Sequence, residues 1–381
     1  MSGLPNREIR VGDCRALLRE LPDESVNCVV TSPPYWGLRD YGIPPTVWGG
    51  DAGHEHAWAT GAVASVRREP NFGPKVRSDV PVGSCECGAW LGTLGLEPTP
   101  EMFIEHIVEV FEEVRRVLRP DGTCWVNIGD SYCGAAGGGT GKNGWLSNRT
   151  VTRVRARMVM DKRVAGLKEK DLVGVPWMLA FALRSAGWWL RAENIWHKAN
   201  PIPESVTDRP CRDHEQVFLF TKSAKYSYDA AAVKQKASGT AHSRVSVYAK
   251  AADKGGVTPK SAEPGSGVRA NKSFHAAVAA LVDERNLRTV WPMVSKPYAG
   301  AHFATFPPEL AQTCILAGCP AGGLVLDPFG GSGTVGEVAE ALGRRWMLLE
   351  LNPAYAELAR ERTAQRGLFG DVAAVSMGGG S

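Results

Sequence analysis

The strongest local constraint in this sequence is a short apolar run that leads into a glycine-rich turn near the C-terminus. Residues 324–334 read LVLDPFGGSGT, which predicts a buried strand, a tight turn and the start of a helix. In an open α/β sheet such a turn lies beyond the carboxyl end of its strand, where ligands bind. Glycines there let a ligand approach the backbone closely. We therefore expect a sheet with a ligand site at this turn.

Strands and helices alternate along much of the remaining chain. Apolar runs predict strands at residues 8–13, 26–31, 123–130, 188–198, 215–223 and 344–351. Apolar residues at helical spacing predict helices at residues 14–21, 101–122, 171–187, 307–318, 333–343 and 353–366. Pro120, Asp121 and Gly122 are expected to end the second helix. The alternation is typical of an α/β fold with a doubly wound, mostly parallel sheet.

The composition favours a soluble intracellular protein. Of 381 residues, 44% are hydrophobic and 22% are charged, which is ordinary for a globular protein. No apolar run approaches the roughly 20 residues of a membrane span, and residues 1–10 lack the apolar core of a signal peptide. Nine cysteines, an odd number, favour reduced thiols. We expect a cytoplasmic protein that does not bind membranes.

Basic residues are concentrated in two segments, although the net charge is only +4. Residues 142–170 contain nine Lys or Arg against two acidic residues, and residues 222–272 contain ten against three. Each segment therefore carries a net charge of about +7. Contact with a polyanion is one interpretation, and a pair of solvated loops is the other.

Two acidic residues lie where a small ligand would need them. Asp327 lies in the glycine-rich turn, where it suits a cationic amino-acid group better than a phosphate. Glu350 ends the next expected strand, 23 residues later, and can accept hydrogen bonds from ribose hydroxyls. Together they indicate an adenosine-containing cofactor, while a tight structural turn is the alternative.

A second loop, residues 31–36 (TSPPYW), follows the expected strand at 26–31. Its two prolines fix φ and remove backbone donors, so its carbonyls stay free to accept hydrogen bonds. Ser32 and the carbonyl of Pro33 can hold an amino group while Tyr35 stacks on the ring that bears it. The alternative is a rigid turn without a chemical role.

Two short pairs of potential metal ligands occur in residues 37–100, which lack periodicity and are expected to form an irregular insertion. They are His54 and His56, and Cys85 and Cys87. Four such ligands can hold a tetrahedral structural zinc ion, although zinc pairs are usually spaced more widely. Free thiols and surface imidazoles are the alternative.

Taken together, the motifs resemble the beta group of DNA amino-methyltransferases. SPPYW near the N-terminus precedes DPFGGSGT near the C-terminus, which is the circularly permuted order of that group. Residues 12–13, 196–223 (WHKANPIPESVTDRPCRDHEQVFLFTKS) and 301–308 (AHFATFPP) also match. The resemblance covers about residues 1–36, 101–230 and 289–366. It implies a seven-stranded, circularly permuted sheet of the S-adenosylmethionine-dependent methyltransferase type, with insertions.

The resemblance also implies residue roles. Ser32, Pro33, Pro34 and Tyr35 would bind the target amine. Glu350 would bind the ribose of S-adenosylmethionine, and Asp13 would lie near its adenine. The methionine part would be lined by Asp327, Phe329, Gly331 and Gly333, and closed by the segment around His302, Phe303 and Pro307. Thr31, Pro328 and Thr334 are expected to complete the cofactor site.

The implied reaction is methylation of an exocyclic amino group of a base in double-stranded DNA. In this family a serine at the position of Ser32 is associated with N4 of cytosine, and an aspartate with N6 of adenine; adenine is therefore the alternative. The base must be flipped out of the duplex, and Tyr35, with Trp36 as a second candidate, would stack on it. A protein glutamine methyltransferase and a non-enzymatic DNA-binding module are the remaining alternatives.

The resemblance also suggests an organisation. Residues 1–36 with 101–230 would form the catalytic part, and 289–366 the cofactor-binding part. Residues 231–288 would be a basic target-recognition insertion, and 367–381 a disordered tail. A cognate restriction endonuclease is an expected partner, and the protein would be a monomer or homodimer.

Overall fold

A computed structural model describes residues 4–38, 43–51, 53–58, 83–134, 164, 166–201, 203–236, 284–295 and 306–367. The chain divides into two compact units. The larger comprises Met1–Tyr228 and Thr289–Ser381, and the smaller comprises Asp229–Arg288.

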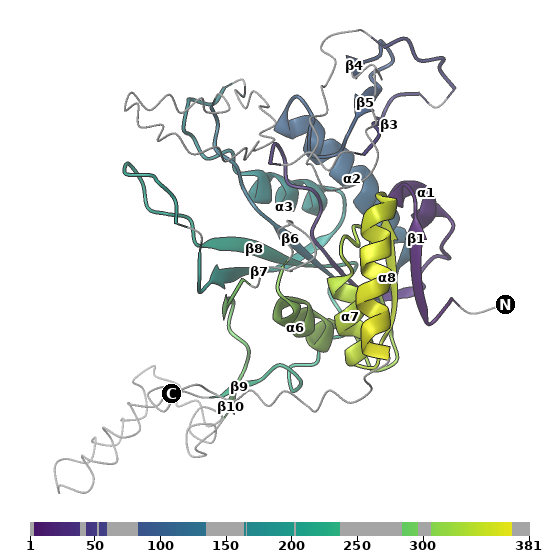
Figure 1. The fold of residues 1–381 in the computed structure, drawn as a ribbon, viewed down its shortest axis with the longest axis vertical. Coiled ribbons are helices and arrows are strands. Elements are labelled where there is room, and N and C mark those ends of the chain that lie inside the picture. The colour runs from purple at the N-terminus through teal and green to yellow at the C-terminus, as the bar shows by residue number, and fades with distance from the viewer. Residues whose placement is uncertain are drawn as a thin grey trace, which may run out of the picture. The chain divides into compact units, whose positions relative to one another are not determined.

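Among the described residues, eight strands form the central sheet of the larger unit (Figure 1). In spatial order they are β1 (Arg7–Val11), β13 (Arg345–Glu350), β12 (Leu324–Asp327), β2 (Val26–Thr31), β6 (Leu118–Ile128), β8 (His214–Thr221), β7 (Trp189–Lys198) and β11 (Val290–Met293). β8 runs antiparallel to both of its neighbours, and all other pairs are parallel. The predicted mostly parallel α/β sheet is confirmed, and β11 adds a short strand to the expected seven.

Helices cover both faces of this sheet. The first group is α1 (Cys14–Arg19), α2 (Pro100–Val117) and α3 (Val175–Ser185). The second group is α6 (Pro308–Gly318), α7 (Thr334–Ala341) and α8 (Pro353–Gly367) (Figure 1). Alternate residues of β6 serve the two faces. Cys124 and Val126 join the core that includes α1–α3, whereas the Thr123 hydroxyl donates to the Gly318 carbonyl of α6 at 3.1 Å.

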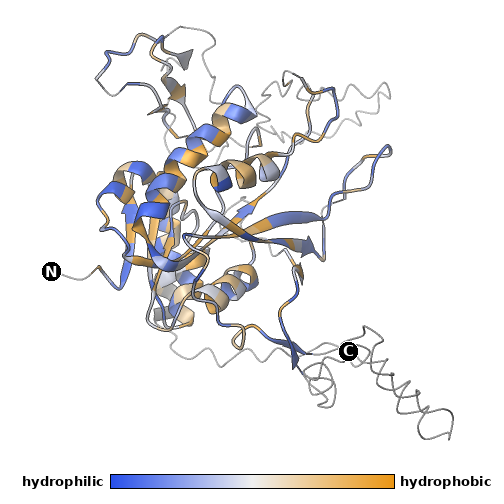
Figure 2. Ribbon diagram, turned by 180° about the vertical axis from the view of Figure 1, so that it is seen from behind, coloured by the Kyte–Doolittle hydropathy of each residue, from blue (hydrophilic) through white to orange (hydrophobic). Residues whose placement is uncertain are grey.

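Helix α2 forms because its cap and its apolar spacing agree. The Thr99 hydroxyl accepts a hydrogen bond from the Met102 amide at 3.2 Å, and Pro100 occupies the first turn. Figure 2 shows both polar and apolar colours along this helix. Its fully buried apolar residues recur at helical spacing and include Phe103, Ile107, Val110, Phe111 and Val114.

The predicted end of this helix was wrong. α2 ends at Val117, and the segment containing Pro120, Asp121 and Gly122 belongs to β6 instead. Leu118 is fully buried and pairs with Val26, and the register shifts before the next pair, so the turn residues are accommodated as an irregularity of the strand. Pairing of Leu118 thus ends the helix before the turn residues, which lie between the Leu118 and Thr123 pairs.

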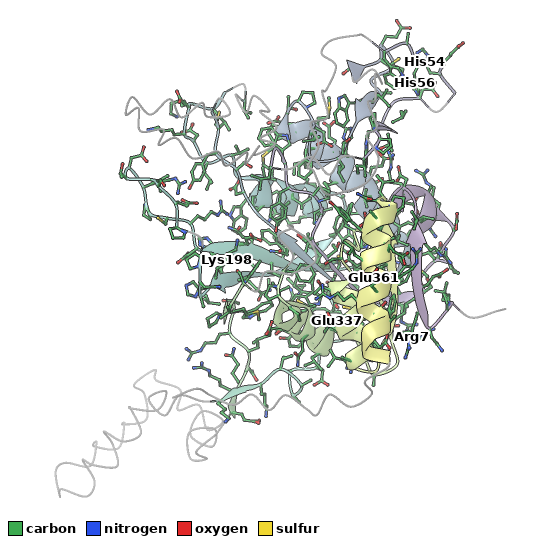
Figure 3. The ribbon with its side chains drawn as sticks, in the orientation of Figure 1. Arg7, His54, His56, Lys198, Glu337 and Glu361 are labelled. Atoms are coloured by element: carbon green, nitrogen blue, oxygen red, sulfur yellow. The ribbon has the colours of Figure 1, made fainter. Side chains whose placement is uncertain are left out.

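Residues 37–100 contain regular structure that the sequence did not reveal. Strands β3 (Thr46–Trp48), β4 (Gly83–Ser84) and β5 (Trp90–Gly92) form an antiparallel sheet in the order β3–β5–β4. Strands of two or three residues are too short to show a period. His54 and His56 lie beside this small sheet (Figure 3).

The described residues of the smaller unit include two short antiparallel strands, β9 (Gln235–Lys236) and β10 (Glu284–Arg285). Across both units, none of the described helices is long and apolar enough to cross a membrane.

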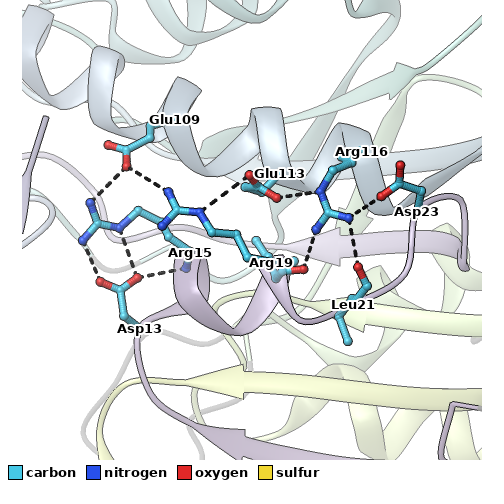
Figure 4. A network of polar contacts seen from close by, with 9 residues as sticks. Asp13, Arg15, Arg19, Leu21, Asp23, Glu109, Glu113 and Arg116 are labelled. Atoms are coloured by element: carbon cyan, nitrogen blue, oxygen red, sulfur yellow. Dashed lines mark hydrogen bonds and ion pairs between the residues drawn. The ribbon is translucent and has the colours of Figure 1, made fainter. Parts of the chain in front are cut away.

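A polar network fastens α1 to α2 (Figure 4). Arg116 of α2 donates to the carbonyls of Leu18 and Leu21 at 2.7 and 2.9 Å, and to the carboxylates of Glu113 and Asp23. The Leu21 carbonyl just beyond α1 thereby gains a donor, and the Leu18 carbonyl gains one in addition to the Leu21 amide at 2.9 Å.

We expect Arg116→Ala to lower the free energy of unfolding by about 1–3 kcal/mol, because it removes the donor to the Leu21 carbonyl and breaks the ion pairs with Glu113 and Asp23. Arg119→Ala is the matched control: its ion pair with Asp121 is about half exposed on both sides, so its loss should cost under about 0.5 kcal/mol. Urea unfolding measures both. Equal effects of the two substitutions would contradict this account.

Candidate functional site

The two loops singled out by their sequences leave the same edge of the sheet. β2 and β12 are adjacent and parallel, with Cys28 opposite Val325 and Val29 opposite Leu326. Just beyond these pairs, the Thr31 hydroxyl donates to Asp327 Oδ1 at 2.6 Å, and both side chains are buried. Residues 32–35 and 328–334 therefore begin side by side.

These loops line one cavity of about 400 Å³, which is within the usual size range of small-molecule sites. Its wall is mainly apolar, with acidic groups placed at a few points. The cavity-lining residues that the sequence had singled out are Asp13, Ser32, Pro33, Pro34, Tyr35, Asp327, Pro328, Phe329, Gly331, Thr334 and Glu350.

Three other expected residues lie outside this lining. Thr31 acts behind the wall by holding Asp327, and Pro307 precedes α6 beside Phe306, which does line the cavity. Gly333 has φ 84°, and a Cβ there would lie 2.9 Å from that of Ala359, so glycine is required for the turn and for packing on α8. His302 and Phe303 lie outside the described residues.

Glu350 braces the glycine-rich turn. Its Oε2 accepts the Gly331 amide and its Oε1 accepts the Asn352 amide, each at 2.7 Å. Burial raises the pKa of this carboxyl despite these hydrogen bonds. A carboxylate offers about four acceptor positions, so both oxygens retain capacity for a ligand hydroxyl.

Asp327 is the more perturbed acid. Burial raises its pKa to about 7, although hydrogen bonds from the Thr31 hydroxyl and the Phe329 amide act in the opposite direction. A buried carboxyl in this state favours a cationic partner, because a nearby positive charge stabilises its ionised form.

Asp13 lies at the cavity edge and caps α1. Its carboxylate accepts the Arg15 amide and two guanidinium hydrogen bonds, the shortest at 2.6 Å (Figure 4). Burial opposes ionisation of Asp13, but the hydrogen bonds and charge of Arg15 lower its pKa overall. This residue is therefore an anion already paired within the protein.

A polar chain that the sequence did not reveal holds Tyr35. Its hydroxyl lies 2.6 Å from Glu215 Oε2 and 3.0 Å from Asn127 Oδ1, and 3.3 Å from the Ser32 hydroxyl. Lys198 pairs with the other Glu215 oxygen at 2.5 Å. Lys198 and Glu215 also line the cavity, and Figure 3 shows Lys198 on β7.

The available sequence signal for these residues was weak. Lys198 and Glu215 fall in the run at 196–223 that matches the family, but nothing marks them within it. Asn127 lies in an apolar strand, and its buried side-chain amide donates to the Gln216 carbonyl of the neighbouring strand. The sequence does not reveal this partner, because it depends on how the strands pair.

The surroundings of Tyr35 also constrain its ring. A Cβ on Gly129 would lie 2.7 Å from Tyr35 Cε2, so glycine permits this close approach. Trp36 is 1% exposed and its indole N–H donates to the Glu97 carbonyl at 3.0 Å. The expectation that Trp36 could stack on a base was therefore wrong, because its ring is in the core.

The four potential metal ligands come together. One ligand atom from each of His54, His56, Cys85 and Cys87 lies within 4.8 Å of the others. By contrast, most of the two basic segments, 142–170 and 222–272, lies outside the described residues.

Comparison with known proteins identifies related chains. A family model described as DNA methylase matches residues 26–361. The Type II methyltransferase M.XycI of Xanthomonas campestris pv. cyanopsidis is 39% identical over 351 residues, which cover 92% of this chain and 85% of the relative. The Type II methyltransferase M.SmaI of Serratia marcescens is 38% identical over 365 residues, covering 96% and 93%.

Among solved structures, a PvuII DNA methyltransferase described as cytosine-N4-specific shares the fold. Its TM-score is 0.52 at 16% sequence identity, with 94% of this chain and 86% of that chain covered.

We expect Glu350→Gln to lower the free energy of unfolding by about 1–3 kcal/mol, because one acceptor oxygen becomes an NH₂ group that faces a backbone N–H. Glu361→Gln, at an exposed position of α8, is the matched control and should change this free energy by less than about 0.5 kcal/mol. Denaturant unfolding compares them. A Glu350→Gln protein as stable as the control would refute the bracing role.

Proposed function

The chain belongs to the DNA methylase family of cytosine-N4 and adenine-N6 methyltransferases, and we propose that it methylates N4 of a cytosine in double-stranded DNA. Family membership makes it an S-adenosylmethionine-dependent DNA methyltransferase. A non-enzymatic DNA-binding module is thereby excluded, and the permuted motif order disfavours a protein glutamine methyltransferase.

The observation that carries the assignment of residues is the shared cavity. The loop at Ser32–Tyr35 and the turn at Asp327–Thr334 line one space, so a target amine and a methyl donor can meet there. S-adenosylmethionine supplies an electrophilic methyl group, whose bond to sulfur breaks with its electron pair left on sulfur as the bond to nitrogen forms. Holding both groups in one site removes much of the entropic barrier.

The residues of the loop at Ser32–Tyr35 can activate the exocyclic amino nitrogen, which is a weak nucleophile. An exocyclic amino nitrogen shares its lone pair with the base ring, so it must be drawn toward tetrahedral geometry. The Ser32 hydroxyl and the Pro33 carbonyl would accept its N–H bonds, and the Tyr35 ring would stack on the base. Glu215 and Asn127 fix that ring through its hydroxyl. A proton then leaves the methylated nitrogen for solvent.

The acids opposite this loop fit the cofactor. Asp327 is buried, and a cationic methionine group would stabilise its ionised form. Glu350 would accept the ribose hydroxyls with its remaining lone pairs. Asp13 would lie near the adenine, where its existing pairing with Arg15 fixes its position. Phe329 would contribute apolar surface beside the methionine part.

The choice of cytosine rests on Ser32, the residue associated with that base at this position of the family motif. Adenine N6 is the second candidate. We also propose that residues 231–288 contact the target DNA, and that a cognate restriction endonuclease recognises the same site. Basic side chains would hold the phosphates, while base-edge contacts would supply specificity.

We expect DNA from cells that express this protein to contain N4-methylcytosine, and Tyr35→Ala to abolish it while cofactor binding is largely retained. Tyr35→Phe, the matched control, keeps the ring and should retain part of the activity. Asp327→Ala should lose both binding and modification. Nucleoside mass spectrometry and calorimetry give the two readouts.

The identity of the modified base tests the choice of cytosine, and the activity of Tyr35→Ala tests the role of the loop. N6-methyladenine in place of N4-methylcytosine would replace the base assignment alone. Near-normal modification by Tyr35→Ala would contradict the role of the loop.

Cofactor binding should weaken as the pH falls through about 7, because the pKa of Asp327 lies near this value in the free protein. A bound cation lowers this pKa, so binding below pH 7 must release a proton. The Kd should therefore rise by up to about tenfold for each unit by which the pH falls below 7. Glu350, whose pKa is also raised by burial, acts in the same direction.

Calorimetry at pH 6 and 8, in two buffers of different ionisation enthalpy, measures both the Kd and the proton release. Asp327→Asn should bind weakly at pH 8 and lose most of the pH dependence. A Kd that is equal at the two pH values in the unsubstituted protein would exclude this role for Asp327.

A further inference from the structure

We propose that His54, His56, Cys85 and Cys87 bind one structural zinc ion, and that this ion holds the β3–β5–β4 sheet in place as a wall of the active cavity. The inference goes beyond the methylation reaction and does not depend on which base is the target. It rests on the geometry of the four ligands and on the contacts that join the small sheet to the catalytic loop.

The ligand geometry is close to that of a zinc site. The four candidate atoms lie within 4.8 Å of one another, and Cys87 Sγ is 3.4 Å from His56 Nδ1. Bonds of about 2.0–2.3 Å in a tetrahedral site place ligand atoms about 3.5 Å apart. Closing the cluster therefore requires side-chain shifts of about 1 Å. Among the described residues, no other group of three or more His, Cys, Asp or Glu was found with this arrangement.

The local backbone brings the two pairs together. Cys85 and Cys87 lie in the turn between β4 and β5, closed by hydrogen bonds from the Cys85 amide to Ala89 and from the Gly88 amide to Cys85. Gly50, which precedes the histidines, has φ 75°, and a Cβ there would lie 2.5 Å from that of Ala89. Its lack of a side chain lets the two segments approach.

The strands of the small sheet are short, so few backbone hydrogen bonds hold them together. Its strands contain two or three residues each, fewer than the usual five or six. A metal ion would join the histidine segment to the cysteine turn across the 28 residues from 57 to 84. Four protein ligands close the coordination sphere, which indicates a structural rather than a catalytic ion.

Two tryptophans pack the sheet against the core, and one of them also lines the cavity. Trp48 of β3 and Trp90 of β5 are buried, and both stack on His106, with ring centroids 5.0 and 5.5 Å away. Trp48 also lines the cavity and carries the Arg15 guanidinium 3.7 Å from its ring centroid. The arrangement of this sheet therefore decides part of the cavity wall.

From His106 the contacts continue to the catalytic loop. His106 Nδ1 lies 3.0 Å from Glu97 Oε1, and both groups are buried. The Glu97 carbonyl accepts the Trp36 indole N–H, and Trp36 directly follows Tyr35. Displacement of the small sheet would reach Tyr35 through this chain.

Metal analysis of the full-length protein, dialysed against metal-free buffer, tests the site. We expect about one zinc per chain, and less than about 0.3 in Cys85→Ser and His56→Ala. Cys211→Ser is the matched control, because Cys211 is exposed and outside the cluster, and it should keep its zinc. Less than about 0.2 zinc per unsubstituted chain, even after zinc is added back, would overturn the proposal.

A second measurement does not require the variants to fold. Cobalt added to the metal-depleted protein should give the absorption bands of tetrahedral thiolate coordination, and added zinc should remove them. Cobalt bound without thiolate bands would place the metal elsewhere and refute this ligand set.

Hydrogen exchange tests the effect on the cavity wall. In the zinc-depleted protein, peptides covering residues 46–48 and 90–97 should exchange at least about tenfold faster, while β8 at 214–221 should be unchanged. If zinc binds but its removal leaves this exchange unchanged, the zinc site stands and only its role in holding the cavity wall is refuted. Neither readout measures methylation, so failure here leaves the proposed reaction untouched.

Discussion

The pairing of β2 with β12 is the interaction on which the cavity depends. Residues 296 positions apart in the sequence, Thr31 and Asp327, meet in a buried hydrogen bond where these strands end. Parallel neighbours send their carboxyl ends to one edge, so the loops that follow must converge. Neither loop lines the cavity alone: the proline loop contributes Ser32 and the Tyr35 ring, the glycine turn follows Asp327, and Glu350 comes from the end of β13.

Charge is retained in this cavity at a cost to the free protein. Burial raises the pKa of Asp327 and of Glu350, which shows that their ionised forms are disfavoured in the absence of a partner. Elsewhere in the lining, Glu215 is paired with Lys198, and its remaining oxygen orients Tyr35. Glu215 is thus paired within the protein, whereas buried Asp327 is suited to a cationic ligand.

Particular residues show which features of the fold and of the site could be predicted from the sequence. The strand and turn at 324–334 were predictable because their apolar run and glycines act locally. Trp36 was misjudged, since adjacency to Tyr35 in the chain does not reveal that its ring points into the core. The end of α2 was misplaced because Leu118, which precedes the turn residues, pairs with Val26 of β2. Glu215 and Asn127 were missed because their partner, Tyr35, is distant in sequence.

The sequence by itself determined the alternation of strands and helices, the two motif loops and the identity of the acids beside them. These features follow from apolar periodicity and from the backbone limits of proline and glycine, which neighbouring residues impose. The tertiary structure alone decided which side chains face the cavity, which pairs hold Tyr35 and how the histidine and cysteine pairs meet. Such contacts depend on the register of strands far apart in the chain, and only packing of the whole core sets that register.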